Sequence, residues 1–278
     1  MASAADTSSS AKAGPLPEPR PLPGTGSLAR LPFLVVAWLV VTCLPATGDK
    51  APPVATFSLV ARDPDTGELG VAVQSKIVAV GTIVPFARAG VGAVATQALA
   101  NTRYGPVALA LLEGGATPAE IIEIFREQDP DIALRQVGIL SATGETAHFT
   151  GEECLAWAGS VSGEDYTVQG NILTGPEVIG AMAKAFEESE GVLAERMLAA
   201  LEAGQEAGGD KRGRQSAALL IVREGWGYGG QNDRFRDLRV DEHAEPIREL
   251  RRVYEKHRAL FPRPDAGRDR PPGDPAGE

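Results

Sequence analysis

The sequence predicts an α+β fold, a four-layer αββα sandwich in which two stacked antiparallel sheets carry helices on both outer faces. Three observations lead to this prediction. Apolar runs with strand-like alternation occur in groups, helical segments follow these groups in pairs, and turn-forming residues join neighbouring strands. A strict alternation of single strands and single helices would instead have indicated a parallel sheet.

The first group of predicted strands begins with a hairpin. Apolar side chains occupy every second position of residues 56–62, the turn sequence RDPDTGE follows, and residues 69–73 return as the second strand. Two more strands are expected at residues 81–86 and 91–96, where glycines keep the backbone between them permissive. Four strands therefore precede the first predicted helix.

Two helices are expected next. The first covers residues 104–113 and ends at a glycine pair, and the second begins at the capping box TPAE of residues 117–120, with proline at its first helical position. The second half of the chain repeats the grouping. It is predicted to contain strands at residues 134–140, 146–150, 166–173 and 216–222, and helices at residues 176–188, 192–203 and 246–260.

The ends of the chain differ in composition from the predicted domain of residues 56–260. Residues 1–30 are rich in Ser, Ala, Pro and Gly and are expected to form a disordered leader, and residues 261–278 a disordered tail. Residues 31–46 contain an uncharged apolar run that suits a secretory signal and is shorter than a membrane-spanning helix of about 20 residues. An uncleaved signal anchor is the alternative, and residues 47–55 read as a linker. Both readings place the domain outside the cytoplasm, exported or held at a membrane by the anchor alone.

Composition excludes several classes of function. The net charge of −10 argues against a nucleic-acid binder, which needs a cationic surface. The two cysteines and three histidines show no zinc-site or disulfide spacing, so we expect no metal and no organic cofactor. The expected partner is a small-molecule or peptide-like substrate. A homodimer is also reasonable for a sandwich with open sheet edges and an amphipathic terminal helix.

Candidate functional residues are polar side chains that lie at the ends of apolar strands or within them. They fall into three clusters: Thr56, Ser75 and Lys76; Thr96, Gln97 and Asn101; and Gln169, Asn171 and Asp210.

Thr56 would be a nucleophile if proteolysis made it the first residue of the chain. A free α-amine has a pKa of about 7.7–8.0, so it can accept the proton of its own hydroxyl group without help from a histidine. A nearby Lys76 would lower the pKa of that amine by like-charge repulsion. The alternative interpretation is structural, because threonine is a common first residue of a strand.

The amides of Gln97, Gln169 and Asn171 could orient an amide substrate or stabilise an oxyanion. Each of these side-chain amides could instead form hydrogen bonds with backbone groups of the fold. Asn171 is the most suggestive, because asparagine is disfavoured within apolar strands. Ser75 or Thr96 acting as the nucleophile without any processing is a third possibility.

Four separated segments of the sequence resemble the domain-of-unknown-function family numbered 1028, which has an N-terminal-nucleophile (Ntn) hydrolase-like fold. These segments are TFSLVARDPDTGELGVAVQSKIVAVG, VPFARAGVGAVATQALANTRYGP, YTVQGNILTGPEV and LEAGQEAGGDKRGRQSAALLIV, and the resemblance covers about residues 56–240. It implies an αββα sandwich and, by analogy of fold, hydrolysis of an amide bond. The first hairpin is similar in shape to that of proteasome-like proteins, although Ser75-Lys76 stands where those proteins have an acidic residue.

These observations together predict an exported Ntn-type hydrolase that cleaves an amide bond in a small or peptide-like substrate. Thr56 would be the nucleophile, Lys76 an electrostatic tuner and Asn171 an oxyanion donor, with the remaining candidates binding substrate. A second trimming step would be needed, since Thr56 lies about ten residues beyond the expected signal cleavage site. The alternative is a catalytically silent ligand-binding or scaffold protein on the same fold.

Overall fold

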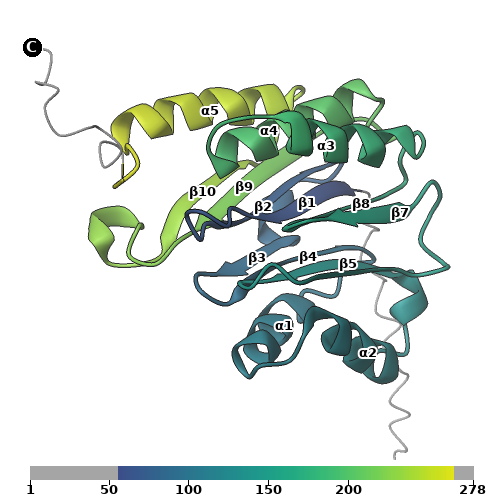
Figure 1. The fold of residues 1–278 in the computed structure, drawn as a ribbon. Helices are drawn as coiled ribbons and strands as arrows, with labels where there is room; N and C mark the ends of the chain where they lie inside the picture. Colours follow the sequence, from purple (N-terminus) through teal and green to yellow (C-terminus); the bar gives the residue numbers. More distant parts are fainter. Residues whose placement is uncertain (1–55, 266–278) are drawn as a thin grey trace, which may run out of the picture. The chain divides into compact units, whose positions relative to one another are not determined.

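The strand that begins at Thr56 lies in the middle of a six-stranded antiparallel sheet. The computed structural model describes residues 56–265, and in it β1 (Thr56–Arg62) pairs with β2 (Leu69–Ser75) on one side and with β8 (Tyr166–Asn171) on the other. The order of strands is β10-β9-β2-β1-β8-β7 (Figure 1). The edge strands are β7 (Gly159–Gly163) and β10 (Arg234–Val240), and β9 (Ser216–Val222) lies between β10 and β2.

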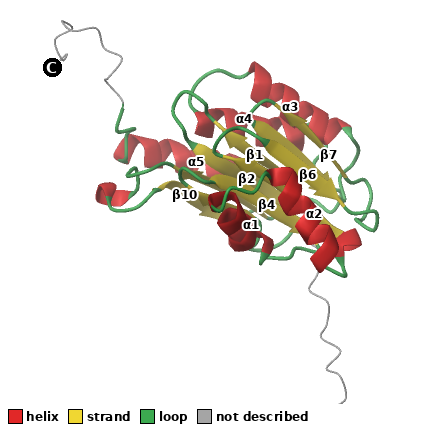
Figure 2. Cartoon of the chain, turned by 60° about the horizontal axis from the view of Figure 1, so that its bottom comes forward, coloured by secondary structure: helices red, strands yellow, loops and turns green. Residues whose placement is uncertain are grey.

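A second antiparallel sheet stacks on the first, and helices cover the outer face of each (Figures 1 and 2). Its order is β3-β4-β5-β6, with β3 (Pro85–Arg88), β4 (Gly92–Ala98), β5 (Arg135–Ser141) and β6 (Thr146–Thr150). Helices α1 (Tyr104–Glu113) and α2 (Pro118–Gln128) cover this sheet. Helices α3 (Glu177–Glu188), α4 (Leu193–Glu206) and α5 (Pro246–Leu260) cover the six-stranded sheet. The predicted αββα sandwich is confirmed.

Alternate side chains of β1 point to opposite faces of the sheet, so this central strand packs into two apolar layers. Phe57 and Leu59 point toward α3 and α4, whereas Val60 packs between the sheets with Val71 and Val73 of β2. Successive side chains of a strand point to opposite faces, so a strand buried on both faces must be apolar at nearly every position. Polar residues on such a strand are therefore exceptional, and those that do occur need a partner.

The structure differs from the sequence-based prediction at three strands. Residues 81–86 were expected to form a strand, but a short 3-10 helix covers Val80–Thr82 and β3 starts only at Pro85. Gly81 is required there, since a Cβ atom would lie 2.6 Å from the Arg239 side chain. β7 and β10 were not predicted. Both are edge strands, and the sequences GSVSG and RFRDLRV lack the apolar alternation that marks the inner strands.

The predictions for the leader, the signal segment and the linker concern residues 1–55, outside the described part of the chain. Residues 261–265 of the predicted tail are described, and Arg263 forms an ion pair with the buried Glu68, with 2.6 Å between Nη1 and Oε2. The folded chain thus extends past residue 260. Between residues 56 and 265, none of the helices combines the length and the apolar character needed to cross a membrane.

Candidate functional site

Thr56 begins β1 with its side chain on the face that the two sheets share, the same face as Val60. Its Oγ1 donates a hydrogen bond to Ser75 Oγ at 3.2 Å. Thr56 is paired with Ser75 of β2 on one side and with Asn171 of β8 on the other. All three side chains are buried. The structure therefore brings together three of the predicted site residues, each from a different strand.

A buried network of amides lies next to Thr56 and joins the two sheets. Gln97 on β4 donates through Nε2 to Thr56 O (3.3 Å), to Gln169 O (3.3 Å) and to Gln136 Oε1 (2.8 Å). Its Oε1 accepts from Ser58 Oγ at 2.6 Å. Gln97 thus contacts the backbone of the candidate nucleophile directly from the opposite sheet.

Two more amides extend the network. Gln169 Nε2 donates to Ser58 Oγ at 2.6 Å, and Asn171 Nδ2 donates to Gln136 Oε1 at 3.1 Å. Gln136 Nε2 in turn donates to Gly170 O at 2.8 Å and to Gly159 O at 3.1 Å. Gln136 was not among the predicted site residues, although a glutamine within the apolar strand RQVGILS is the same signal that singled out Asn171. These amides link the two stacked sheets through hydrogen bonds next to Thr56.

Asp210 connects this region to the loop that precedes β9. The Asp210 carboxylate is buried and accepts from the backbone N–H of Lys76 (3.1 Å), the backbone N–H of Arg212 (2.9 Å) and the Arg212 guanidinium (3.1 Å). Since Lys76 directly follows Ser75, the loop is tied to the end of β2 next to the Thr56 partner. A buried carboxylate from a distant segment of the chain thus lies at the end of β2.

Replacing Asp210 with asparagine should loosen this loop. An asparagine offers one oxygen in place of two and turns an N–H group toward the donors of Lys76 and Arg212. We expect Asp210→Asn to lower the free energy of unfolding by about 1–3 kcal/mol, measured by urea denaturation. Asp237→Asn is the matched control, because Asp237 forms a surface ion pair with Arg234 and its loss should cost about 1 kcal/mol or less. Equal losses in the two variants would contradict a structural role for Asp210.

Lys76 has a more peripheral place than the sequence suggested. Its side chain is exposed, and Nζ donates to the carbonyl oxygen of Arg214 at 3.4 Å. The ammonium group is thus directed along the same loop that Asp210 holds. Any effect of Lys76 on Thr56 must act through its charge and not through a hydrogen bond that the structure shows.

Thr96 and Asn101 lie on the outer face of the small sheet, away from Thr56. Thr96 Oγ1 donates to the Asn101 carbonyl, and Asn101 Nδ2 donates to Asp129 Oδ2 at 3.1 Å. Asp129 also accepts from Tyr104 and Arg135; burial opposes its ionised form, but these hydrogen bonds outweigh burial and hold its pKa well below the ordinary value. This second cluster braces α1 and α2 against the small sheet and is not part of the Thr56 site.

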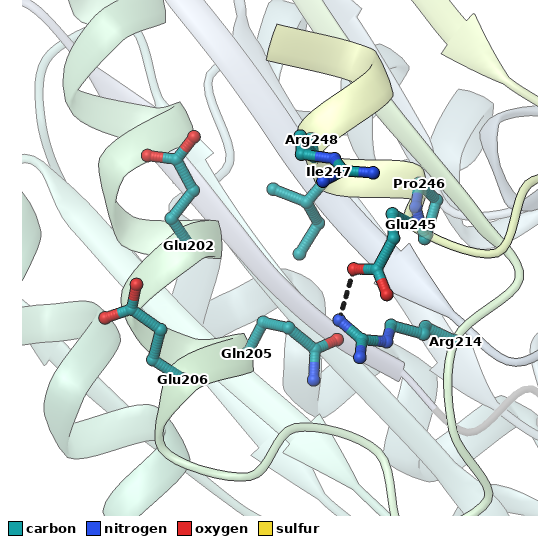
Figure 3. Close-up of a pocket in the computed structure, with 8 residues that line it drawn as sticks. All are labelled: Glu202, Gln205, Glu206, Arg214, Glu245, Pro246, Ile247 and Arg248. Atoms are coloured by element: carbon teal, nitrogen blue, oxygen red, sulfur yellow. Dashed lines mark hydrogen bonds and ion pairs between the residues drawn. The ribbon is translucent and has the colours of Figure 1, made fainter.

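A cavity of about 300 Å³ opens between the end of α4 and the start of α5, next to the loop that carries Asp210 (Figure 3). Arg214 of this loop forms an ion pair with Glu245 across it, at 2.5 Å, and the Gln205 amide points from α4 toward Arg214. Gln205 Oε1 and both amide atoms of the buried Gln74 have no hydrogen-bond partner in the described part of the chain. Gln74 lies beside Phe57 on the helix-covered face of β2, the same face as the cavity.

Other groups capable of catalysis are few among residues 56–265. Burial raises the pKa of the Cys154 thiol to about 11, so the thiol is neutral near pH 7 and a poor nucleophile. No cluster of three metal-ligating side chains occurs in the same residues. Thr56 with Ser75, Asn171 and the amide network is therefore the best-organised candidate site.

Comparison with known proteins places the chain in one group. A family model described as "Family of unknown function (DUF1028)" matches residues 56–250, which begin at Thr56 and include every strand of both sheets. The crystal structure of protein SPO2555 from Silicibacter pomeroyi, described as family-model DUF1028, is 33% identical in sequence. The match covers 73% of this chain and 86% of that chain, with a TM-score of 0.68. No curated protein matches.

Proposed function

This chain belongs to the DUF1028 family of unknown function, and from that premise we propose that it is an exported Ntn-type hydrolase that cleaves an amide bond in a small or peptide-like substrate. One observation carries the proposal. Thr56 is the first residue of the central strand, with its hydroxyl on the face between the sheets and bonded to Ser75. A threonine in that position needs only a free α-amine to have its own base.

Cleavage of the bond between Ala55 and Thr56 would supply that amine. The amine takes the proton of Oγ1, directly or through a water, while Oγ1 attacks the carbonyl carbon of the substrate. The tetrahedral intermediate collapses to an ester on Thr56, and the leaving amine departs with the proton. Water then hydrolyses the ester, which restores the hydroxyl group and releases the carboxylic acid.

Asn171 is the donor best placed to stabilise the oxyanion. A primary amide carries two N–H donors, and the bond to Gln136 uses one of them. Gln97 and Gln169 are bonded between the sheets, and we assign them to holding Thr56 and Asn171 in place. Lys76 adds positive charge at the end of β2, which would lower the pKa of the new amine and favour its unprotonated form, whereas the charge of Arg212 is balanced by Asp210.

The length of the mature chain tests the proposal before any substrate is known. Intact-mass analysis and N-terminal sequencing of protein from its native host should find a chain that starts at Thr56. The same measurement tests export, since a secreted or periplasmic fraction should contain this form. A mature chain that retains residues before Thr56 would leave the mechanism without its base.

A second candidate function is ligand binding without catalysis, and the cavity beside α4 favours it. The amide of Gln205 lines the cavity, and its Oε1 has no hydrogen-bond partner among the described residues, as in a site for a small amide. On this view the chain is a binding or scaffold protein on the sandwich fold. A panel of amides would distinguish the two, because a binding protein should turn over none of them.

A further inference from the structure

The two sides of the sandwich differ in how their edge strands meet. On one side, β6 of the smaller sheet is bonded to β7 of the larger sheet, with Ser160 Oγ 2.6 Å from His148 Nδ1. On the other side, β3 faces β9, and β10 extends the larger sheet beyond it (Figure 1). A cavity of about 450 Å³ lies here, between β3 and the strands β9 and β10. In the part of the chain that the structure describes, the sandwich is thus open beside β3.

The lining of this cavity shows that it runs along the free edge of β3. Every residue of β3 contributes to it, Pro106 and Leu109 come from α1, and residues 218–220 come from β9. Helix α1 covers the outer face of the smaller sheet, whereas β9 belongs to the opposite sheet. The cavity therefore reaches both faces of β3, as it would if one further strand could be added beside it.

The backbone of β3 keeps polar groups available at this edge. Thr96 N–H donates to Val84 O at 3.2 Å, which fixes the parity of the antiparallel ladder between β3 and β4. Hydrogen-bonded pairs alternate along such a ladder, so the N–H and C=O of Ala87 point away from β4. Among residues 56–265, neither group has a hydrogen-bond partner. Pro85 adds a free C=O at the same edge but no N–H.

The inner face of β10 is charged, whereas the inner faces of its neighbours are apolar. Arg234, Asp237 and Arg239 lie opposite inner-face residues of β9, line the cavity and are exposed. Asp237 pairs with both arginines, at 2.6 Å and 3.6 Å, so these three side chains carry one net positive charge. Arg88 of β3, which pairs with Glu113, adds a third arginine to the lining. The cavity therefore favours a ligand with negative charge.

We propose that this groove, formed by the free edge of β3 and the charged face of β10, binds an extended acidic peptide of a partner protein as an added strand. Side chains of such a strand would point alternately to the two faces of the smaller sheet. The residue opposite Ala87 shares its inner side and meets the arginines of β10, so it is acidic. The next residue, opposite Phe86, faces Pro106 and Leu109 of α1, so it is apolar.

Charge also favours this peptide over a second copy of the chain. Two chains that paired edge to edge through β3 would each bring three arginines and one aspartate to the shared interface, and like charges repel. An acidic peptide instead balances the surplus positive charge. The groove is independent of the proposed hydrolase site, because it requires neither cleavage before Thr56 nor any residue of the amide network.

Binding of two matched peptides to the full chain tests the proposal. In acetyl-STELETS-amide the two glutamates share one face of a strand and the leucine lies on the other, and the order of side chains is the same in both directions. Acetyl-STKLKTS-amide differs only in the sign of its charges. We expect the glutamate peptide to bind about tenfold more tightly by calorimetric titration, because attraction becomes repulsion at two positions. Equal affinity, tighter binding of the lysine peptide, or no binding of the glutamate peptide at about 1 mM would overturn the proposal.

Hydrogen exchange at Ala87, measured by NMR, tests the strand pairing itself. The bound glutamate peptide should slow exchange of the Ala87 amide on the order of tenfold or more, because that N–H gains a carbonyl partner. Binding that leaves this exchange rate unchanged would contradict the added strand. An Ala87 amide that is already protected in the free protein would also contradict it, since another segment of the chain or a second copy would then cover the edge.

Arg234→Gln tests the charge of the groove. Arg234 is exposed, so the variant should fold, and it should bind the glutamate peptide about threefold more weakly. Arg126→Gln is the matched control, because it makes the same change in net charge at an exposed arginine of α2, outside the groove. That variant should keep the wild-type affinity. Equal losses in the two variants would show a response to net charge alone and would overturn the assignment to this groove.

Discussion

Thr56→Ala should abolish the proposed amide hydrolysis. The alanine variant lacks Oγ1, the atom that forms the ester intermediate in the proposed mechanism, whichever substrate is used. We expect a fall of about 1,000-fold or more in kcat, because loss of a nucleophile removes the covalent route entirely. The measurement is turnover of a panel of small amides and peptides by the mature chain.

Thr56→Ser is the control that separates chemistry from folding. The serine variant keeps the hydroxyl group and the α-amine, so it should retain measurable activity. Both variants lose the methyl group of Thr56 from a buried position, so any effect of that loss on folding is common to both. Circular dichroism should show the same fold in both. If Thr56→Ala and the wild type hydrolyse the same amide equally fast, Thr56 is not the nucleophile and Ser75 becomes the first alternative to test. Activity in neither protein would favour the binding function.

The inner strands were predictable because most of their residues are apolar, which indicates burial on both faces. β1, β2, β5 and β9 are short apolar runs bounded by turn residues or charged segments, and the capping box at the start of α2 is present as expected. Antiparallel pairing of strands that are close in the chain follows from tight turns. The layer order then follows, because each apolar face has to be covered by another layer.

The site was less predictable because its members meet through contacts between distant segments. Thr56, Ser75 and Asn171 could be grouped as polar residues at strand ends, and they are adjacent in the register. Nothing in the local sequence indicates that Asp210 reaches the backbone of Lys76. Thr96 and Gln97 are neighbours on a strand and must point to opposite faces, but the sequence does not say which of them faces Thr56.

The amide network also shows that a polar residue within an apolar strand can have either of two roles. A buried glutamine can contact a substrate, or it can satisfy another buried polar group inside the fold. Gln97, Gln136 and Gln169 do the second. Gln97 and Gln136 donate to backbone carbonyls of the opposite sheet, and Gln169 bonds Ser58 within its own sheet. The sequence can locate such residues but cannot choose between the roles, because the choice depends on which side chains the second sheet brings opposite.

Gln97→Met should be the most destabilising substitution in the network. Methionine has a similar length, but it removes two N–H donors, which three acceptors share, and one accepted bond from a fully buried position. Each bond contributes about 0.5–1.5 kcal/mol, and a partner left unsatisfied adds to the loss. We therefore expect a loss of about 3–5 kcal/mol and a fall in melting temperature on the order of 10 °C. Thermal and urea unfolding measure both.

The same substitution tests whether the network acts as a unit. Gln97 and Gln136 share a bond, so the double variant with Gln136→Met should lose less stability than the sum of the two single losses. Gln128→Met on the exposed surface of α2 should change stability by about 0.5 kcal/mol or less. Strictly additive losses would show that the two glutamines stabilise the protein separately. Because Gln97 also holds the carbonyl of Thr56, a cooperative network predicts that Gln97→Met lowers kcat at temperatures where the variant is still folded.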